Sequence, residues 1–404
     1  MKRVVVTGLG AVSACGIGVS ALWDACREGR SAVRDFRLPE LKKQMVTNAG
    51  FMSQEDMATV WADKKPRFQD RVAAMALHAA AEAVGQAGLG PEHFGSRCGV
   101  VVGSGVGGSE TIQRNALIFV QDPLARVDPF AVPKVMANAS ASWIAMEYGA
   151  TGPMLCISTA CASATQSVGL GVSLIRSGQL DRCIVGGSEA QLSATTFRAW
   201  EAMRVMTQGL CRPFSKGRDG MSLGDGAGIL ILESEEAALS RGAKILGEIA
   251  GFASNCDAID LLRPNAERAA ECMNAALADA GVEPSRVGYV NAHGTATVAN
   301  DRSEGEALRT VFGAGLDRIL VSSTKPVHGH ALGASGALEL IVSIQALREG
   351  IAPPTVNFLE PDPDIGIDPV SGGPTPFAGE VALSNSFAFG GVNATIVIAR
   401  PREN

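Results

Sequence analysis

One pattern of residues occurs twice in the chain and restricts its fold more than any other feature. A short apolar strand, a turn of small residues, an apolar helix and a final glycine follow one another in LCISTACASATQSVGLGVSLIRSG (155–178). The same order returns in LVSSTKPVHGHALGASGALELIVSIQALREG (320–350). Strands that lead directly into helices are typical of α/β units. The pattern therefore predicts an α/β protein made of two similar units that join near residue 242.

Further strands and helices alternate around the two copies of this pattern. Short runs rich in β-branched residues predict strands, and longer apolar stretches that end at glycine predict helices. The first unit, residues 1–242, has expected strands at 4–8, 97–103, 154–159, 182–187 and 227–233, and expected helices at 70–88, 133–149 and 161–178. The second unit, residues 243–404, has expected strands at 244–252, 287–292, 317–323 and 380–398, and expected helices at 265–281, 301–312 and 333–349.

The composition of the chain excludes several classes of protein. Its 404 residues are 46% hydrophobic, which is enough to bury a large core. No apolar run approaches the roughly 20 residues of a membrane-spanning helix, and the net charge of -6 argues against nucleic acid as the main partner. The nine cysteines show no disulfide-framework spacing, and the first residues lack a secretory signal. We therefore expect a globular cytoplasmic protein without a nucleic-acid or membrane partner.

Two cysteines stand five positions apart in CISTACASATQS (156–167) and differ in their expected surroundings. Cys156 lies between apolar neighbours in a predicted strand, so we expect its thiol to be buried and unreactive. Cys161 follows that strand and opens the next helix, where free backbone N–H groups and the helix dipole favour a thiolate. Cys161 is therefore the candidate nucleophile, although an unreactive thiol is the usual interpretation of a single cysteine.

Three of the five histidines follow predicted strands of the second unit. His293 lies in YVNAHGTATVAND, and His328 and His330 lie in STKPVHGHALGASG. Open α/β sheets build their sites at the carboxyl ends of strands, so these turns can bring imidazoles to the Cys161 thiol. No spacing of metal ligands accompanies them, and we expect no bound metal.

Five motifs of the chain together are similar to those of the elongating β-ketoacyl-acyl-carrier-protein synthases. They are TACASA (159–164), RPFSKGRDGMSLGDGAG (212–228), NAHGTAT (291–297), STKPVHGHALGASGALE (323–339) and NSFAFGGVN (385–393). All five occur in the order and spacing of that family, and the resemblance covers residues 1–402. It implies a thiolase-like fold, in which two duplicated α/β halves form five layers in the order αβαβα, and it implies a dimer.

The resemblance also implies a reaction and the residues that perform it. Cys161 would accept an acyl chain as a thioester, and its backbone N–H with that of Phe389 would form the oxyanion hole. His293 and His330 would stabilise the enolate that forms when a malonyl thioester loses carbon dioxide. This enolate would attack the acyl-cysteine in a decarboxylative Claisen condensation, which lengthens a fatty acid or polyketide by two carbons.

Supporting roles follow from the same resemblance. Lys325 would form a charged network with Glu304 that orients the histidines, and Thr295 with Thr297 would bind the amides of pantetheine. Phe387, Ala388 and Phe389 would border the acyl pocket. No cofactor would be bound, because the substrates arrive on the phosphopantetheine of an acyl carrier protein. By pattern alone, Asp301 and Glu304 also fit the acidic first turn of a helix, Lys325 fits a surface cation, and both phenylalanines fit a core.

The implied partners are an acyl carrier protein, loaded with acyl or malonyl groups, and a second subunit. The surface that binds an acidic carrier protein must carry positive side chains. The candidates are Lys64, Lys65, Arg67 and Arg71, with Arg204 and Arg212 as a second choice. A solvated basic loop is the equally good alternative. The second subunit is expected to be another copy, and a subunit similar to a chain-length factor remains possible.

Two other functions on the same fold fit the sequence less well. A non-catalytic chain-length factor typically lacks the active cysteine, whereas Cys161, His293 and His330 are all present. A thiolase would carry a second cysteine near the C-terminus, whereas no cysteine follows Cys272.

Several residues depart from the housekeeping members of the family. The family commonly has glycine at the position of Ala388 and a hydroxyl or apolar residue at that of His328. Met221 and Ser222 replace a bulkier pair, and the segment 200–215 is shorter. In these traits the chain resembles the specialised branch of the family, which includes the nodulation-factor and aryl-polyene ketosynthases.

Overall fold

The strands of the two predicted units have the same spatial order. The computed structural model describes residues 2–62 and 67–402. In the first half the order is β1-β8-β7-β5-β6, and in the second half it is β9-β15-β14-β10-β11. The first set comprises β1 (Val4–Ser13), β5 (Cys98–Gly103), β6 (Met154–Leu155), β7 (Arg182–Glu189) and β8 (Gly226–Ser234). The second set comprises β9 (Gly247–Cys256), β10 (Val287–Asn291), β11 (Leu320–Ser322), β14 (Val381–Ala388) and β15 (Val392–Ala399).

This order confirms the duplication that the repeated pattern predicts. In both sets the first strand along the chain pairs with the fifth, the fifth with the fourth, the fourth with the second, and the second with the third. Strands β1 and β9 connect the two sets through only two residue pairs, Val5 with Glu248 and Val6 with Gly247. The halves therefore meet edge to edge at one short contact, and most of their packing is through helices.

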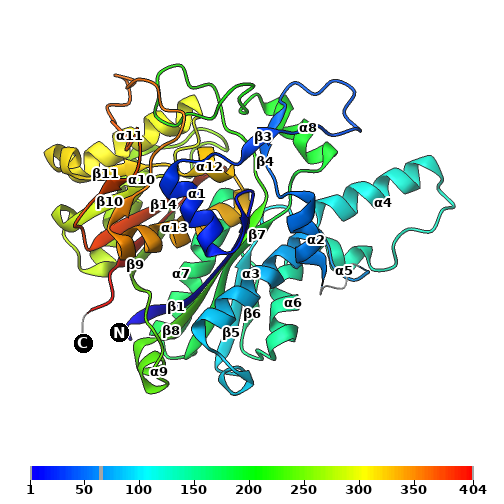
Figure 1. Cartoon of the computed structure of the whole chain (residues 1–404), viewed down its shortest axis with the longest axis horizontal. Coiled ribbons are helices and arrows are strands. Elements are labelled where there is room, and N and C mark those ends of the chain that lie inside the picture. Colours follow the sequence, from blue (N-terminus) through cyan, green and yellow to red (C-terminus); the bar gives the residue numbers. More distant parts are fainter. Residues whose placement is uncertain (1, 63–66, 403–404) are drawn as a thin grey trace.

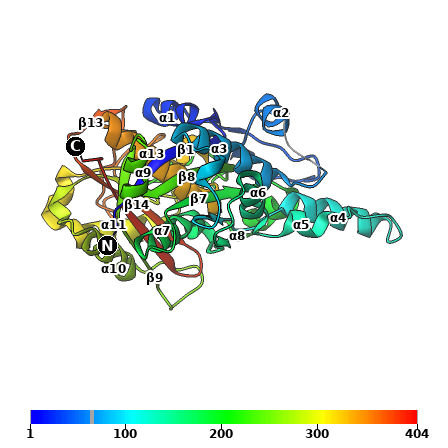
Figure 2. The same cartoon turned by 90° about the horizontal axis from the view of Figure 1, so that it is seen from below.

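Helices fill the space between the two sets of strands and cover both outer faces. The repeated pattern supplies the inner layer, in which α7 (Ser163–Arg176) and α13 (Ser335–Glu349) pack on each other and on strands of both halves. On one outer face α3 (Arg71–Ala87) packs on β1 and β8 beside α6 (Ala139–Tyr148). On the other, α10 (Ala266–Ala280) packs on β9 and β15 beside α11 (Val298–Phe312) (Figures 1 and 2). The layers follow the expected αβαβα order.

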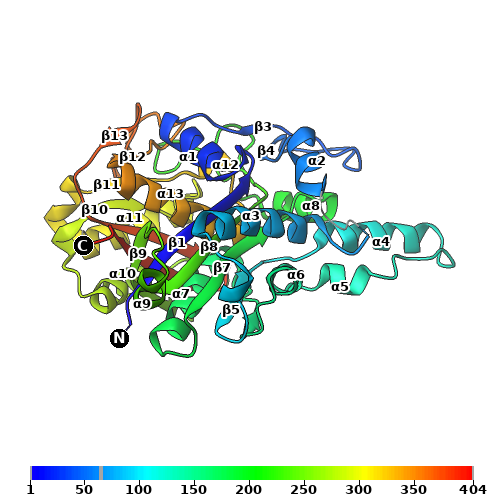
Figure 3. The same cartoon turned by 60° about the horizontal axis from the view of Figure 1, so that its bottom comes forward.

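The other elements lie at the periphery of these layers. The remaining helices are α1 (Val19–Glu28), α2 (Gln54–Ala62), α4 (Ser109–Gln121), α5 (Ala131–Val135), α8 (Ala194–Met203), α9 (Glu235–Ser240) and α12 (Lys325–His328). The short strands are β2 (Gly16–Ile17), β3 (Val33–Asp35), β4 (Asn48–Gly50), β12 (Ile351–Ala352) and β13 (Thr375–Pro376). Helices α4 and α5 form an arm that projects from the body (Figure 3). None of the described helices combines the length and the apolar character that crossing a bilayer requires.

Three of the expected elements have a different form in the structure. The expected strand 380–398 is a hairpin, because Gly390 and Gly391 take positive φ values of 87° and 72° and turn the chain between β14 and β15. The expected helix 133–149 consists of α5 and α6, separated by the extended backbone of Met136. The expected strand 154–159 ends at Leu155, because β6 is an edge strand that pairs with β5 through only two residues.

Small residues allow β1 and α3 to approach each other closely. An added Cβ at Gly10 would lie 1.9 Å from the carbonyl oxygen of Ala79, and one at Gly8 would lie 2.1 Å from that of Ala83. Real carbon and oxygen atoms do not approach so closely, so any side chain at these positions would push the helix away from the strand. The contact between the first strand and its covering helix therefore depends on glycine.

We expect the Gly10→Ala variant to lower the free energy of unfolding by about 1–3 kcal/mol, because the added methyl group overlaps the α3 backbone. The midpoint of urea unfolding, followed by circular dichroism, measures the change. Gly85→Ala is the matched control, because Gly85 lies in α3 with open space around its added Cβ. Alanine favours helix over glycine by about 1 kcal/mol, so this variant should unfold at a higher urea concentration. Equal midpoints for the two variants would contradict the close packing.

Candidate active site

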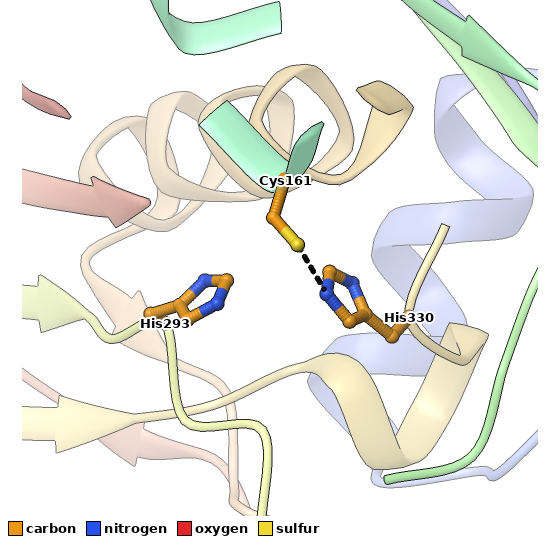
Figure 4. A group of neighbouring side chains, drawn as sticks. All are labelled: Cys161, His293 and His330. Carbon is orange, nitrogen blue, oxygen red and sulfur yellow. Dashed lines mark hydrogen bonds between the residues drawn. The ribbon is translucent and has the colours of Figure 1, made fainter. Parts of the chain in front are cut away.

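Three buried side chains from the two halves meet at the end of one cavity. Cys161 belongs to a 3-10 turn (Ala160–Ala162) before α7, His293 follows β10, and His330 follows α12. The Cys161 Sγ atom lies 3.1 Å from Nε2 of His330. The rings of His293 and His330 have centroids 5.5 Å apart and are nearly perpendicular, and both rings lie beside the thiol (Figure 4). The structure thus brings together the cysteine and the two histidines that the sequence singles out.

The repeated pattern positions two of these residues by the same local device. In each half a 3-10 turn follows the third strand and precedes an inner helix, as Ala160–Ala162 in the first half and Leu332–Ala334 in the second. Both turns begin with a non-glycine residue at positive φ, 49° at Ala160 and 38° at Leu332. Such backbone strain is typical of turns that expose a functional group. Cys161 lies in the first turn, and His330 precedes the second.

The surroundings of Cys161 act against the expected thiolate. Burial raises the pKa of the Cys161 thiol to about 12, and the nearby Lys325 charge offsets only part of this effect. Burial also lowers the pKa of His330 well below its usual value, and Lys325 lowers it further. Desolvation therefore opposes the thiolate that the sequence predicts and works against the helix dipole. The short contact allows the Cys161 thiol to donate to Nε2 of His330.

Lys325 fixes the orientation and the tautomer of His293. Its ammonium donates to the carbonyl oxygen of His293 and lies 3.3 Å from Nδ1 of the same residue. An ammonium can only donate, so Nδ1 of His293 is an acceptor and its proton is on Nε2. Burial, followed by the Lys325 charge, lowers the pKa of His293 well below its usual value. His293 is therefore a neutral N–H donor at this site.

The expected ion pair between Lys325 and Glu304 is not formed. Lys325 pairs with Glu339, which is fully buried in α13, and that carboxylate needs a cation at this depth. Glu304 instead accepts the backbone N–H groups of His293 and Gly294, both at 2.8 Å. Glu304 therefore orients His293 by accepting its backbone N–H group, and not through Lys325. Sequence reasoning missed Glu339, although a lone acid in an apolar helix is a signal of a buried, paired carboxylate.

The alternative interpretation of Asp301 and Glu304 as the acidic start of a helix is only partly correct. Helix α11 begins at Val298, so Asp301 lies in its first turn and Glu304 in the next. Both carboxylates are buried. Asp301 accepts the backbone N–H groups of Phe214 at 2.7 Å and Ala296 at 3.1 Å. These two acids therefore hold the loop that carries His293.

The cavity has one polar wall and one aromatic wall. The hydroxyl oxygens of Thr295 and Thr297 lie 2.9 Å apart on the polar side. Phe387 contacts the His293 ring edge to face, and the ring of Phe389 stacks on Trp200 with centroids 5.9 Å apart. The lining residues that sequence reasoning missed are Trp200, Met203, Val205, Asp257, Leu261, Leu262, Arg263, Pro264, Ala299, Asn300, Gly391 and Asn393. Met221, noted only as a departure from the family, and Ala388 also line the cavity.

His328 lies outside this cavity. Its ring is buried, with Nδ1 2.7 Å from the carbonyl oxygen of Gly329 and Nε2 3.1 Å from the hydroxyl of Thr324. Burial lowers its pKa to about 3. His328 is therefore a neutral core residue with both ring nitrogens in use.

The expected docking cations have different surroundings. Lys64 and Lys65 lie outside the described residues. Arg67 is exposed, with its guanidinium 5.6 Å from the ring centroid of Phe68. Arg71 is largely buried and pairs with Asp225 at 2.8 Å, so it is not a free surface cation. Of the second choices, Arg204 is exposed and Arg212 is half-buried.

The surroundings of Cys156 also differ from the expectation. Cys156 lies after the end of β6 and is half-buried rather than buried. Its thiol donates to the carbonyl oxygen of Ala137 at 3.2 Å, and burial raises its pKa. Cys156 does not line the cavity, so it takes no part in this site.

The three central residues also have the geometry of a metal site. Ligand atoms of Cys161, His293 and His330 lie within 4.8 Å of one another, a spacing that a zinc ion can bridge. A metal there would occupy the sulfur and Nε2 atoms that now share a hydrogen bond. Metal binding and acyl transfer at this site would therefore exclude each other.

Comparisons with known proteins agree with this geometry. The family models "Beta-ketoacyl synthase, N-terminal domain" and "Beta-ketoacyl synthase, C-terminal domain" match residues 1–238 and 246–359. The chain is 41% identical to nodulation protein E of Rhizobium sp. (strain N33), over 98% of each chain. It is 36% identical to 3-oxoacyl-[acyl-carrier-protein] synthase 2 of Synechocystis sp., over 99% of this chain and 98% of the relative.

Solved structures with the same fold include other ketosynthases. The ishigamide ketosynthase/chain length factor matches with a TM-score of 0.94 and 33% identity, covering 99% of this chain and 100% of that chain. A β-ketoacyl synthase from Burkholderia phymatum STM815 matches with a TM-score of 0.92 and 32% identity over the whole of both chains. By its family models, its relatives and its fold, this chain belongs to the β-ketoacyl synthase family.

Proposed function

We propose that the protein is an elongating β-ketoacyl-acyl-carrier-protein synthase. It condenses malonyl-carrier protein with an acyl chain held on Cys161 and so lengthens a fatty acid or polyketide by two carbons. The observation that carries this proposal is the 3.1 Å hydrogen bond between Cys161 Sγ and His330 Nε2, beside a second imidazole donor. A non-catalytic subunit would not need this arrangement of nucleophile, base and donor.

The first step transfers the acyl group from a carrier thioester to Cys161. Nε2 of His330 accepts the thiol proton as Sγ attacks the thioester carbonyl, which avoids a buried thiolate at rest. A new carbon–sulfur bond forms to Cys161, the bond to the carrier sulfur breaks, and the proton leaves with the carrier thiol. The backbone N–H groups of Cys161 and Phe389 are the proposed donors to the oxyanion.

The second step needs donors for the enolate that forms when malonyl loses carbon dioxide. His293 offers its Nε2–H because Lys325 occupies its Nδ1. His330 Nδ1 lies 2.9 Å from the hydroxyl of Ser335, and a hydroxyl can either accept from Nδ1–H or donate to bare Nδ1. With its proton on Nδ1, His330 can accept the thiol proton at Nε2 during loading. With its proton on Nε2, it can donate a hydrogen bond to the enolate oxygen. The enolate carbon then forms a bond to the acyl carbonyl carbon, the carbon–sulfur bond to Cys161 breaks, and the released sulfur takes up a proton from solvent.

Three observations support the proposed second subunit, carrier-protein partner and cytoplasmic location. The exposed apolar side chains of the α4–α5 arm, such as Phe119 and Leu124, and the exposed Leu155 on the edge strand β6 support the proposal of a second subunit. A solved relative is described as a type II PKS acyl-carrier protein in complex with its ketosynthase, which supports a carrier protein as the substrate-bearing partner here. The nine free cysteines support a cytoplasmic location.

Incubation with acyl-carrier proteins should add one acyl group to Cys161, because its thiol is the one beside a base at the end of the cavity. Intact-mass spectrometry with peptide mapping measures the adduct. Cys161→Ala should abolish it. Cys156→Ala is the matched control, since it removes a nearby thiol outside the cavity, and it should load normally. An adduct that survives in Cys161→Ala would refute the assignment.

We expect His293→Ala to slow malonyl decarboxylation by about 10²–10³-fold, the usual effect of losing one donor to a developing oxyanion. Acyl loading should change far less, because His330 rather than His293 contacts the thiol. Release of carbon dioxide and the rate of adduct formation measure the two steps. His93→Gln, a change of a histidine remote from the cavity, is the control. Equal losses in both steps would contradict the separate roles.

The alkylation of Cys161 by iodoacetamide should accelerate about tenfold per pH unit from pH 7 to pH 9 without reaching a plateau. The raised pKa of the thiol, about 12, keeps the thiolate a small fraction throughout this range, and that fraction grows tenfold per unit. Mass spectrometry of quenched samples gives the rate at each pH. A plateau below pH 8 would mean that the resting site is a thiolate–imidazolium pair.

A further inference from the structure

The mouth of the active-site cavity carries one charged side chain that the proposed reaction does not use. Apart from the neutral histidines and Cys161, the described residues that line the cavity include two ionisable side chains, Asp257 and Arg263. Asp257 is buried, and its carboxylate accepts hydrogen bonds from the Asn393 amide at 2.7 Å and the Asn265 backbone at 3.0 Å. Arg263 is exposed. The mouth therefore presents a positive charge.

Short hydrogen bonds hold the backbone around Arg263. The Asp260 carboxylate accepts the backbone N–H groups of Leu262 at 2.8 Å and Arg263 at 2.9 Å. The Gly390 N–H donates to the carbonyl oxygen of Leu261 at 2.8 Å, which ties this segment to the β14–β15 turn beside Phe389. The backbone of Arg263 is thus held at the rim of the cavity, while its side chain extends into solvent.

The guanidinium of Arg263 is free to bind an anion. Among the described residues, no carboxylate lies within the 4.0 Å that defines an ion pair with it, and the Arg263 charge acts on Asp260 only from beyond that distance. Asp260 is the acidic neighbour, and its Oδ1 atom is already engaged by the two backbone groups. A planar guanidinium with five donors matches the oxygens of a phosphate ester.

We infer that Arg263 binds the phosphodiester of the phosphopantetheine arm at the cavity mouth. This inference rests on the proposed function, because it requires the thioester end of that arm to reach Cys161. The phosphate lies at the opposite end of the arm from the sulfur. An arm that passes the Thr295 and Thr297 hydroxyls therefore leaves its phosphate near the rim. Arg263 is a positioning residue in this scheme, since it contacts the carrier group and not the reacting atoms.

Two small thioesters with the same acyl chain test the inference. One ends in phosphopantetheine and the other in pantetheine without the phosphate, and mass spectrometry gives kcat/KM for acylation of Cys161 by each. We expect the unaltered protein to prefer the phosphorylated thioester. Arg263→Gln should reduce this preference about tenfold, the effect of one lost charge-assisted hydrogen bond. Arg348→Gln, at an exposed arginine that does not line the cavity, should keep the preference unchanged.

The outcomes separate the inference from the proposed function. A preference that is absent in the unaltered protein, or that persists in Arg263→Gln, would overturn the role of Arg263 alone. An equal loss of rate with both thioesters would also overturn it, because the phosphate would then make no difference. A lack of any adduct on Cys161 with both thioesters would overturn the proposed function and this inference with it.

Discussion

The active site depends on one buried ion pair, Lys325 with Glu339. Neither charge is stable alone at this depth, since an unpaired ammonium or carboxylate in a protein interior costs several kcal/mol. Together they place a fixed positive charge beside two imidazoles. That charge disfavours protonation of both His293 and His330. The Lys325 ammonium also donates to Nδ1 of His293 and so sets the tautomer of that ring. The histidines are therefore ready to donate or accept hydrogen bonds without carrying charge.

The Lys325 charge also acts on the Cys161 thiol. Desolvation of Cys161 raises the cost of a thiolate, and the helix that begins at Ser163 and the Lys325 charge lower that cost only in part. In the proposed reaction the sulfur becomes anionic as it attacks, when His330 takes its proton.

The two halves repeat the same strand order, and their equivalent turns contribute different residues to the site. Equivalent turns before the inner helices contribute Cys161 from one half and the segment of His330 from the other, and both turns begin at a residue with positive φ. Helices α7 and α13 pack on each other between the two sets of strands, and the two turns that precede them are in contact. The loop of His293 is fixed separately by the Glu304 and Asp301 carboxylates.

The sequence by itself determined the duplicated α/β architecture, the identity of Cys161, His293 and His330, and the family. These follow from local patterns, because strand and helix periodicity and the spacing of short motifs are properties of neighbouring residues. It did not determine that Lys325 pairs with Glu339, that Arg71 is buried against Asp225, that burial raises the pKa of Cys161, or that Trp200 and Arg263 reach the cavity. Only the tertiary structure decided these points, because ion-pair choice, desolvation and cavity walls depend on side chains that are far apart in the chain and meet only after folding.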